Sequence, residues 1–141
     1  MTISSRLYLL IVLSVVSCTP QLSSGIFRYE SQDDISPRYH VLYDVEYSDG
    51  QIAFSEYLQY RYSHEWYREG MDFNQRVIIK LYFRNNGTIH SIRLFEHGDL
   101  PLPQDLYDYI AAISREAPGT WTVRYKKVKA YHCFIAVVKL Y

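Results

Sequence analysis

The sequence predicts an α+β domain in which two helices pack on one face of a three-stranded antiparallel sheet. Three observations support this prediction: an alternating strand–turn–strand segment, an amphipathic stretch on each side of it, and a final extended region rich in β-branched and aromatic residues. The order helix, hairpin, helix, strand is typical of α+β domains. The chain of 141 residues has room for one such domain.

The first element is the apolar segment Leu7–Val16, which is too short to cross a bilayer. Its length is about half of the roughly 20 residues that a membrane-spanning helix needs. Arg6 precedes it and Ser17 ends it directly before Cys18, which is the order of a secretory signal. The ending VVSC also resembles the lipobox of bacterial lipoproteins. We therefore expect residues 1–17 to be a cleaved signal peptide and Cys18 to be lipidated, the alternative being a hydrophobic first strand or helix.

Residues 18–38 are expected to form a flexible tether, because the stretch TPQLSSG is small and polar. The folded domain, residues 39–141, would begin where HVLYDVEY alternates as a short extended lead-in. In the helix that follows, Phe54 and Leu58 lie on one apolar face. Ser48 and Gln51 have the spacing of a capping box, which predicts the start of this helix.

The hairpin is the clearest element of the sequence. Asn86-Gly87 separates two strand-like runs in RVIIKLYFRNNGTIHSIRLF and suits a type I′ turn. Pairing outward from the turn predicts three pairs on one largely apolar face: Phe83 with His90, Leu81 with Ile92, and Ile79 with Leu94. The opposite face carries Lys80, Tyr82, Arg84, Ser91 and Arg93. The sheet is therefore expected to be covered on one face and exposed to water on the other.

A second helix is predicted over PQDLYDYIAAISREAP, with Pro103 in its first turn. Its apolar face holds Leu106, Ile110, Ile113 and Ala117. The region from Trp121 to Tyr141 is predicted as one long strand, or as two strands separated near Lys126 and Lys127. Within its last part, the side chains of Cys133, Ile135 and Val137 should alternate with those of His132, Phe134, Ala136 and Val138.

Composition and spacing argue against nucleic-acid binding and against catalysis. Lys plus Arg and Asp plus Glu number 15 each, so no overall field favours nucleic acid. His132 and Cys133 are neighbours, and on a strand they point to opposite faces, which excludes a nucleophile–base pair. If Cys18 is lipidated, Cys133 has no intrachain disulfide partner.

The remaining histidines do not form a recognised catalytic or metal motif. His90, Glu96 and His97 lack a zinc-site spacing, and His64-Glu65 lacks the second histidine of a metalloprotease helix. There is no glycine-rich phosphate loop and no nucleophile elbow. The sequence therefore predicts a protein that is not an enzyme and that has no cofactor and no metal.

Residues 47–141 resemble the C-terminal domain of TonB-family energy transducers. YSDG stands where that family has an aromatic-Pro-Gly-Gly before a helix, and the hairpin turn ends in Asn-Gly as in the family. The other matching positions are Tyr62, Gly70 and Trp121. Three family prolines are replaced, by Ser48, Ser63 and Val123, so the resemblance is to a divergent member.

That resemblance implies a domain that binds an extended segment of an outer-membrane transporter by adding it as a strand to a sheet edge. The final strand is expected to supply this edge. The partner-binding residues expected on it are Tyr131, His132, Phe134, Ala136, Val138 and Lys139. The alternative is an edge that is protected by Lys139 and the chain end and binds nothing.

Lipidation of Cys18 would make the protein a periplasmic lipoprotein rather than an energy transducer. Thr19 is not the aspartate that is associated with inner-membrane retention, so the expected location is the outer membrane, facing the periplasm. The expected partners are the membrane, through the lipid, and an envelope protein such as a transporter segment. Two alternatives remain: a structural envelope lipoprotein without a transient ligand, and an energy transducer with an uncleaved N-terminal anchor.

Overall fold

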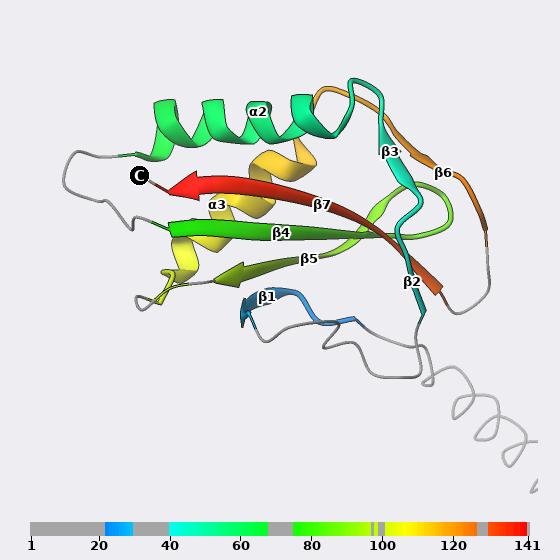
Figure 1. Cartoon of the computed structure of the whole chain (residues 1–141), viewed down its shortest axis with the longest axis horizontal. Helices are drawn as coiled ribbons and strands as arrows, with labels where there is room; N and C mark the ends of the chain where they lie inside the picture. Colours follow the sequence, from blue (N-terminus) through cyan, green and yellow to red (C-terminus); the bar gives the residue numbers. More distant parts are fainter. Residues whose placement is uncertain are drawn as a thin grey trace, which may run out of the picture.

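The computed structural model describes residues 22–29, 40–67, 75–96, 98, 101–126 and 130–140. A five-stranded sheet carries two helices on one face, and a two-stranded sheet lies at one end (Figure 1). The predicted α+β class is therefore confirmed, but the main sheet has five strands and not three. The expected signal peptide and Cys18 lie outside the described residues.

The three predicted strands form the antiparallel centre of the main sheet, and a short parallel strand flanks them on each side. In spatial order the strands are β1 (Gly25–Arg28), β5 (Ile89–Glu96), β4 (Gln75–Phe83), β7 (Ala130–Leu140) and β2 (His40–Leu42). The small sheet pairs β3 (Val45–Tyr47) with β6 (Trp121–Val123). The helices are α2 (Gln51–Arg61), its π-helical extension η1 (Tyr62–Trp66), and α3 (Gln104–Arg115).

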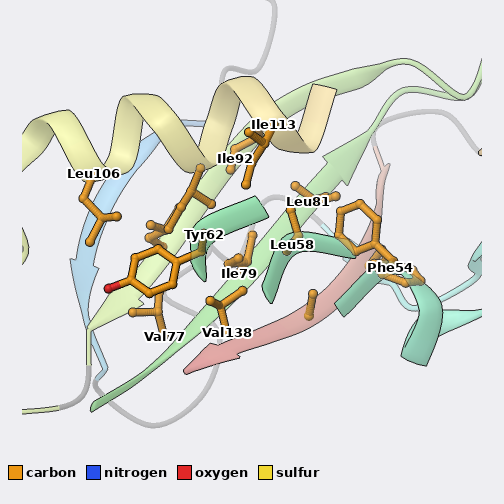
Figure 2. Close-up of a cluster of buried hydrophobic side chains, with 14 of the residues drawn as sticks. Phe54, Leu58, Tyr62, Val77, Ile79, Leu81, Ile92, Leu106, Ile113 and Val138 are labelled. Carbon is orange, nitrogen blue, oxygen red and sulfur yellow. The ribbon is translucent and has the colours of Figure 1, made fainter. Parts of the chain in front are cut away.

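The core lies between the two helices and the main sheet. Its largest fully buried side chains come from both layers, as Figure 2 shows: Phe54, Leu58, Tyr62, Ile79, Leu81, Ile92, Leu106 and Ile113. The pairs of Leu81 with Ile92 and Ile79 with Leu94 are confirmed. Each buried side chain of this size contributes about 1.5–3 kcal/mol through the apolar surface that it removes from water.

The hairpin turn differs from the predicted type I′ turn. The amide of Gly87 donates to the carbonyl of Arg84 over 3.0 Å, and Gly87 has a φ of 83°, which favours glycine. This is a three-residue loop with a bulge, and it pairs Phe83 with Ile89. The predicted pair of Phe83 with His90 is therefore wrong, because the ladder shifts by one residue between Phe83 and Tyr82.

The prediction of a second, water-exposed sheet face is correct for Arg84, which is exposed, but wrong for the middle of the face. Tyr82, Ser91 and Arg93 are buried on that face. The Arg93 guanidinium lies 3.6 Å from the ring centroid of Phe27, a residue of β1, in a cation–π contact. Burial raises the pKa of Tyr82, against the opposing effect of the nearby Arg93 charge. A short strand from the expected tether thus helps to cover residues that looked solvent-facing in the hairpin alone.

The expected tether, residues 18–38, is not without structure. Gly25–Arg28 form β1, which runs parallel to β5 and places Ile26 against the edge of the core. Regular structure therefore begins before residue 39. Four residues are too few to show a strand period, so the sequence pattern could not identify this strand.

The capping box predicted at Ser48 and Gln51 does not form. The N-cap of α2 is Gly50, with a φ of 91° and no side-chain hydrogen bond. The Ser48 hydroxyl instead accepts a hydrogen bond of 3.1 Å from the amide of Thr120. The side chain of Gln51 reaches across to β7, where it donates to the carbonyl of Ile135 over 2.7 Å. Both side chains therefore fix α2 to other parts of the fold.

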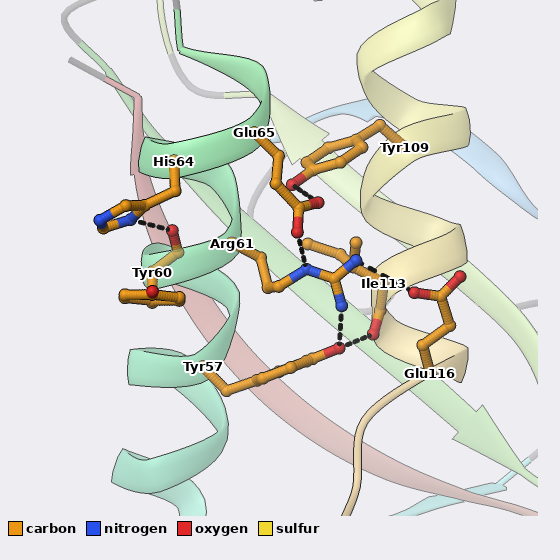
Figure 3. Close-up of polar contacts among 8 residues, drawn as sticks. All are labelled: Tyr57, Tyr60, Arg61, His64, Glu65, Tyr109, Ile113 and Glu116. Atoms are coloured by element: carbon orange, nitrogen blue, oxygen red, sulfur yellow. Dashed lines mark hydrogen bonds and ion pairs between the residues drawn. The ribbon is translucent and has the colours of Figure 1, made fainter.

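A polar network holds α2 and η1 against α3 (Figure 3). Arg61 forms ion pairs with Glu65 and, over 3.1 Å, with Glu116 beyond the end of α3. It also donates a hydrogen bond of 3.1 Å to the hydroxyl of Tyr57. The Tyr109 hydroxyl of α3 donates to Glu65 over 2.9 Å. The hydrogen bond from Arg61 lowers the pKa of Glu65, which favours the charged carboxylate that this network needs.

Candidate functional site

One edge of the main sheet is open along most of β7. β2 pairs with β7 only from Ala130 to His132, and after Leu42 the chain leaves the edge towards β3. From Ile135 to Lys139 no strand among the described residues lies on this side of β7. Open edges present unpaired main-chain groups that can pair with another chain.

The outward-facing main-chain groups belong to alternate residues of β7. The carbonyl of Ile135 and both the amide and the carbonyl of Lys139 bond to side chains of α2, which lies outside the strand. Because the direction of main-chain groups alternates along a strand, the amide and carbonyl of Val137 point the same way. Val137 makes no such side-chain hydrogen bond in the described part of the chain.

A groove follows this edge between α2 and β7, with a volume of about 560 Å³. Its walls are Gln51, Ile52, Ser55, Glu56, Gln59 and Ser63 on the helix side and Arg76, Ala136, Val137 and Lys139 on the sheet side. Ile52 is 76% exposed and Val137 is 42% exposed, so the groove offers apolar surface as well as main-chain groups.

A second hollow, of about 650 Å³, continues the groove towards β3. It is lined by residues 43 and 45–51 and by Cys133, Phe134 and Ile135. Gln51 lies at the boundary and lines both hollows. Together the two hollows are lined by β7 from Cys133 to Lys139 and include its open edge.

The helix side of the groove is a row of polar residues that the sequence analysis did not identify. Gln51, Ser55, Gln59 and Ser63 follow one another at intervals of four, and residues four apart are neighbours on a helix surface. The row runs beside the buried residues Phe54, Leu58 and Tyr62. The four-residue repeat of glutamine and serine was the sequence signal for it, but only the structure shows what the row faces.

The residues expected to bind a partner do not all face the open edge. The side chains of Phe134, Ala136 and Val138 are buried in the core and that of His132 is buried between Asp44 and Asn85, so none of the four is exposed to a partner. Tyr131 and His132 lie where β2 already pairs with β7. Lys139 is exposed at the end of the groove. The predicted alternation is confirmed, but the accessible side chains are those of Ile135, Val137 and Lys139.

His132 is a structural residue. Its side chain is fully buried, with Nδ1 2.7 Å from the Asp44 carboxylate and Nε2 2.7 Å from the Asn85 side-chain oxygen. These contacts join β7, the segment after β2 and the hairpin turn. The side chain of Cys133 lies on the other face of the sheet, where its residue pairs with Tyr82, as expected for neighbours on a strand.

Within the described ranges, no group of three or more potential metal-ligating side chains lies together. His97, which the sequence analysis considered beside His90 and Glu96, lies outside those ranges. No described helix is long and apolar enough to span a membrane. The open edge of β7 and its groove are the candidate site.

A comparison of the chain with known protein families, curated proteins and solved structures found no match. The resemblance to the TonB C-terminal domain therefore stays a prediction, and the function has to be argued from the geometry of the β7 edge.

Proposed function

We propose that this protein is a binding module that captures an extended polypeptide segment by adding it as a strand to β7. The observation that carries the proposal is the open edge from Ile135 to Lys139, with an exposed Val137 that lines a groove. In strand addition, main-chain hydrogen bonds supply much of the affinity and flanking side chains supply the preference.

The side chains at the groove suggest which segments would be preferred. Its lining carries charges of both signs, from Arg76 and Lys139 on the sheet and from Glu56 on α2. The exposed Ile52 and Val137 favour an apolar side chain nearby. The proposed ligand is therefore an extended segment with alternating apolar residues.

We further propose that the module acts in the cell envelope, attached to a membrane by a lipid on Cys18. In this setting the bound segment would belong to an envelope protein, for example an outer-membrane transporter. The short apolar run, the VVSC ending and the likeness to TonB-family domains support this. Mass spectrometry of the mature protein should find an acylated N-terminus at Cys18, and a mature chain that retains Met1 would reject the anchor.

Selection from an unbiased display library of twelve-residue peptides tests the binding activity. We expect peptides with alternating apolar residues to be enriched on the folded protein. When such a peptide is bound, amide hydrogen exchange should slow at Val137, because its amide gains a partner. The matched control is the amide of Ala136, which faces β4 and should exchange at the same rate with and without peptide.

Two outcomes would contradict the proposal. If no peptide is enriched, the alternative of a structural envelope lipoprotein without a transient ligand is favoured. If enriched peptides protect amides elsewhere and leave the exchange of Val137 unchanged, the protein binds peptides at a different surface.

A further inference from the structure

The open edge of β7 is partly occupied by the molecule's own glutamines. The side-chain amide of Gln59 donates to the carbonyl of Lys139 over 2.9 Å and accepts from the amide of Lys139 over 2.8 Å. A side-chain amide has a planar donor and acceptor pair, like a peptide group. Gln59 therefore makes with Lys139 the two reciprocal hydrogen bonds that a residue on an antiparallel neighbouring strand would make.

Gln51 bonds to β7 at the other end of the groove, where its side-chain amide donates one hydrogen bond to the carbonyl of Ile135. The spacing of the two glutamines matches the strand. Eight residues of α2 correspond to about 12 Å at about 1.5 Å per residue. The four residues from Ile135 to Lys139 correspond to about 13 Å at about 3.3 Å per residue. The helix thus places one glutamine side chain at Ile135 and the other at Lys139. At Val137, the outward-facing residue between them, the groove has the short side chain of Ser55.

We propose that Gln51 and Gln59 are a built-in competitor of the partner strand, which must displace both side-chain amides in order to pair along the whole edge. This inference rests on the proposed strand addition. Binding would begin at Val137, where no side chain among the described residues bonds to the edge, and would spread to Ile135 and Lys139 as the glutamines are released. The two glutamines would also protect the edge of the free protein from pairing with other chains.

Replacing Gln59 by Met tests the competition. Methionine has nearly the same length and a similar helix propensity, but it cannot bond to the main chain of Lys139. The Gln59→Met variant should bind a display-selected peptide about tenfold more tightly, since the peptide no longer exchanges two existing hydrogen bonds for its own. Gln59→Ala is a second variant, with the same expected direction.

Gln104→Met is the matched control, because Gln104 is an exposed glutamine at the start of α3 that bonds to Asp108 and not to β7. Its affinity for the peptide should equal that of the wild type. Amide exchange in the free proteins gives a separate readout: the Lys139 amide should exchange faster in Gln59→Met and at the wild-type rate in Gln104→Met.

The results separate this inference from the function on which it rests. If the peptide protects Val137 in both proteins but binds Gln59→Met no more tightly than the wild type, strand addition holds and the competition is wrong. Weaker binding to Gln59→Met would mean that Gln59 contacts the partner instead of competing with it. If the peptide never protects Val137, strand addition itself is wrong.

Discussion

Replacing Phe134 by Ala should lower the free energy of unfolding by about 3–5 kcal/mol, as expected for the loss of a buried aromatic side chain. The ring of Phe134 packs edge-on against Phe54 of α2 and Trp121 of β6, with centroid distances of 5.5 and 4.9 Å. It therefore joins the main sheet, a helix and the small sheet. Phe134 was expected among the partner-binding residues, and its burial assigns it to the core instead.

Chemical denaturation with urea is the measurement for this prediction. The matched control is Val137→Ala on the same strand, where the side chain is 42% exposed and the loss should be well below that of Phe134→Ala. If Phe134→Ala unfolds at the wild-type denaturant concentration but loses its peptide, Phe134 is a recognition residue and the described packing is wrong.

The elements whose apolar residues repeat with a clear strand or helix period could be predicted from the sequence. The alternation in RVIIKLYF and the three- and four-residue spacing of Leu106, Ile110 and Ile113 identified the hairpin and the second helix, and both kinds of pattern marked the residues that are buried. The turn was only partly predictable, because Asn86-Gly87 suits more than one hairpin loop. The bulge beside it shifted Phe83 by one position, while the pairs further from the turn were correct.

The contacts that depend on distant segments were not predictable. β1 is too short for a period, and although the extended segment that contains β2 was predicted, its parallel pairing with β7, like that of β1 with β5, joins segments far apart in the sequence. The burial of Arg93 therefore could not be foreseen, because Phe27 lies in a segment with the composition of a linker. For the same reason, the sequence placed the open edge on the correct strand but could not show that β2 closes its beginning.

The candidate site, like the fold, could be predicted only in part. The final strand and its alternation followed from the sequence, whereas Gln51 was assigned to a capping box and Gln59 to no role. A glutamine has no fixed preference between a helix cap, solvent and a strand edge, so its partner is decided by the position of the helix. That position depends on the network of Arg61, Glu65 and Tyr109, which joins residues from two helices.

A proline at Val137 has the largest expected effect on binding. Proline removes the outward-facing amide and places its ring in the path of an added strand, while an edge position with no partner strand can accept it. The Val137→Pro variant should therefore stay folded and bind a display-selected peptide about a hundredfold more weakly, or not at all. Val137→Thr is the matched control, because it keeps the amide and the β-branched shape.

The affinity of such a peptide for the wild type, Val137→Pro and Val137→Thr, measured by calorimetry on proteins that unfold at similar temperatures, tests the central claim most directly. Strand addition at β7 predicts binding to the wild type and to Val137→Thr, and loss of binding to Val137→Pro. Equal binding to a folded Val137→Pro variant would contradict the account, because no strand could then be pairing with the amide of Val137.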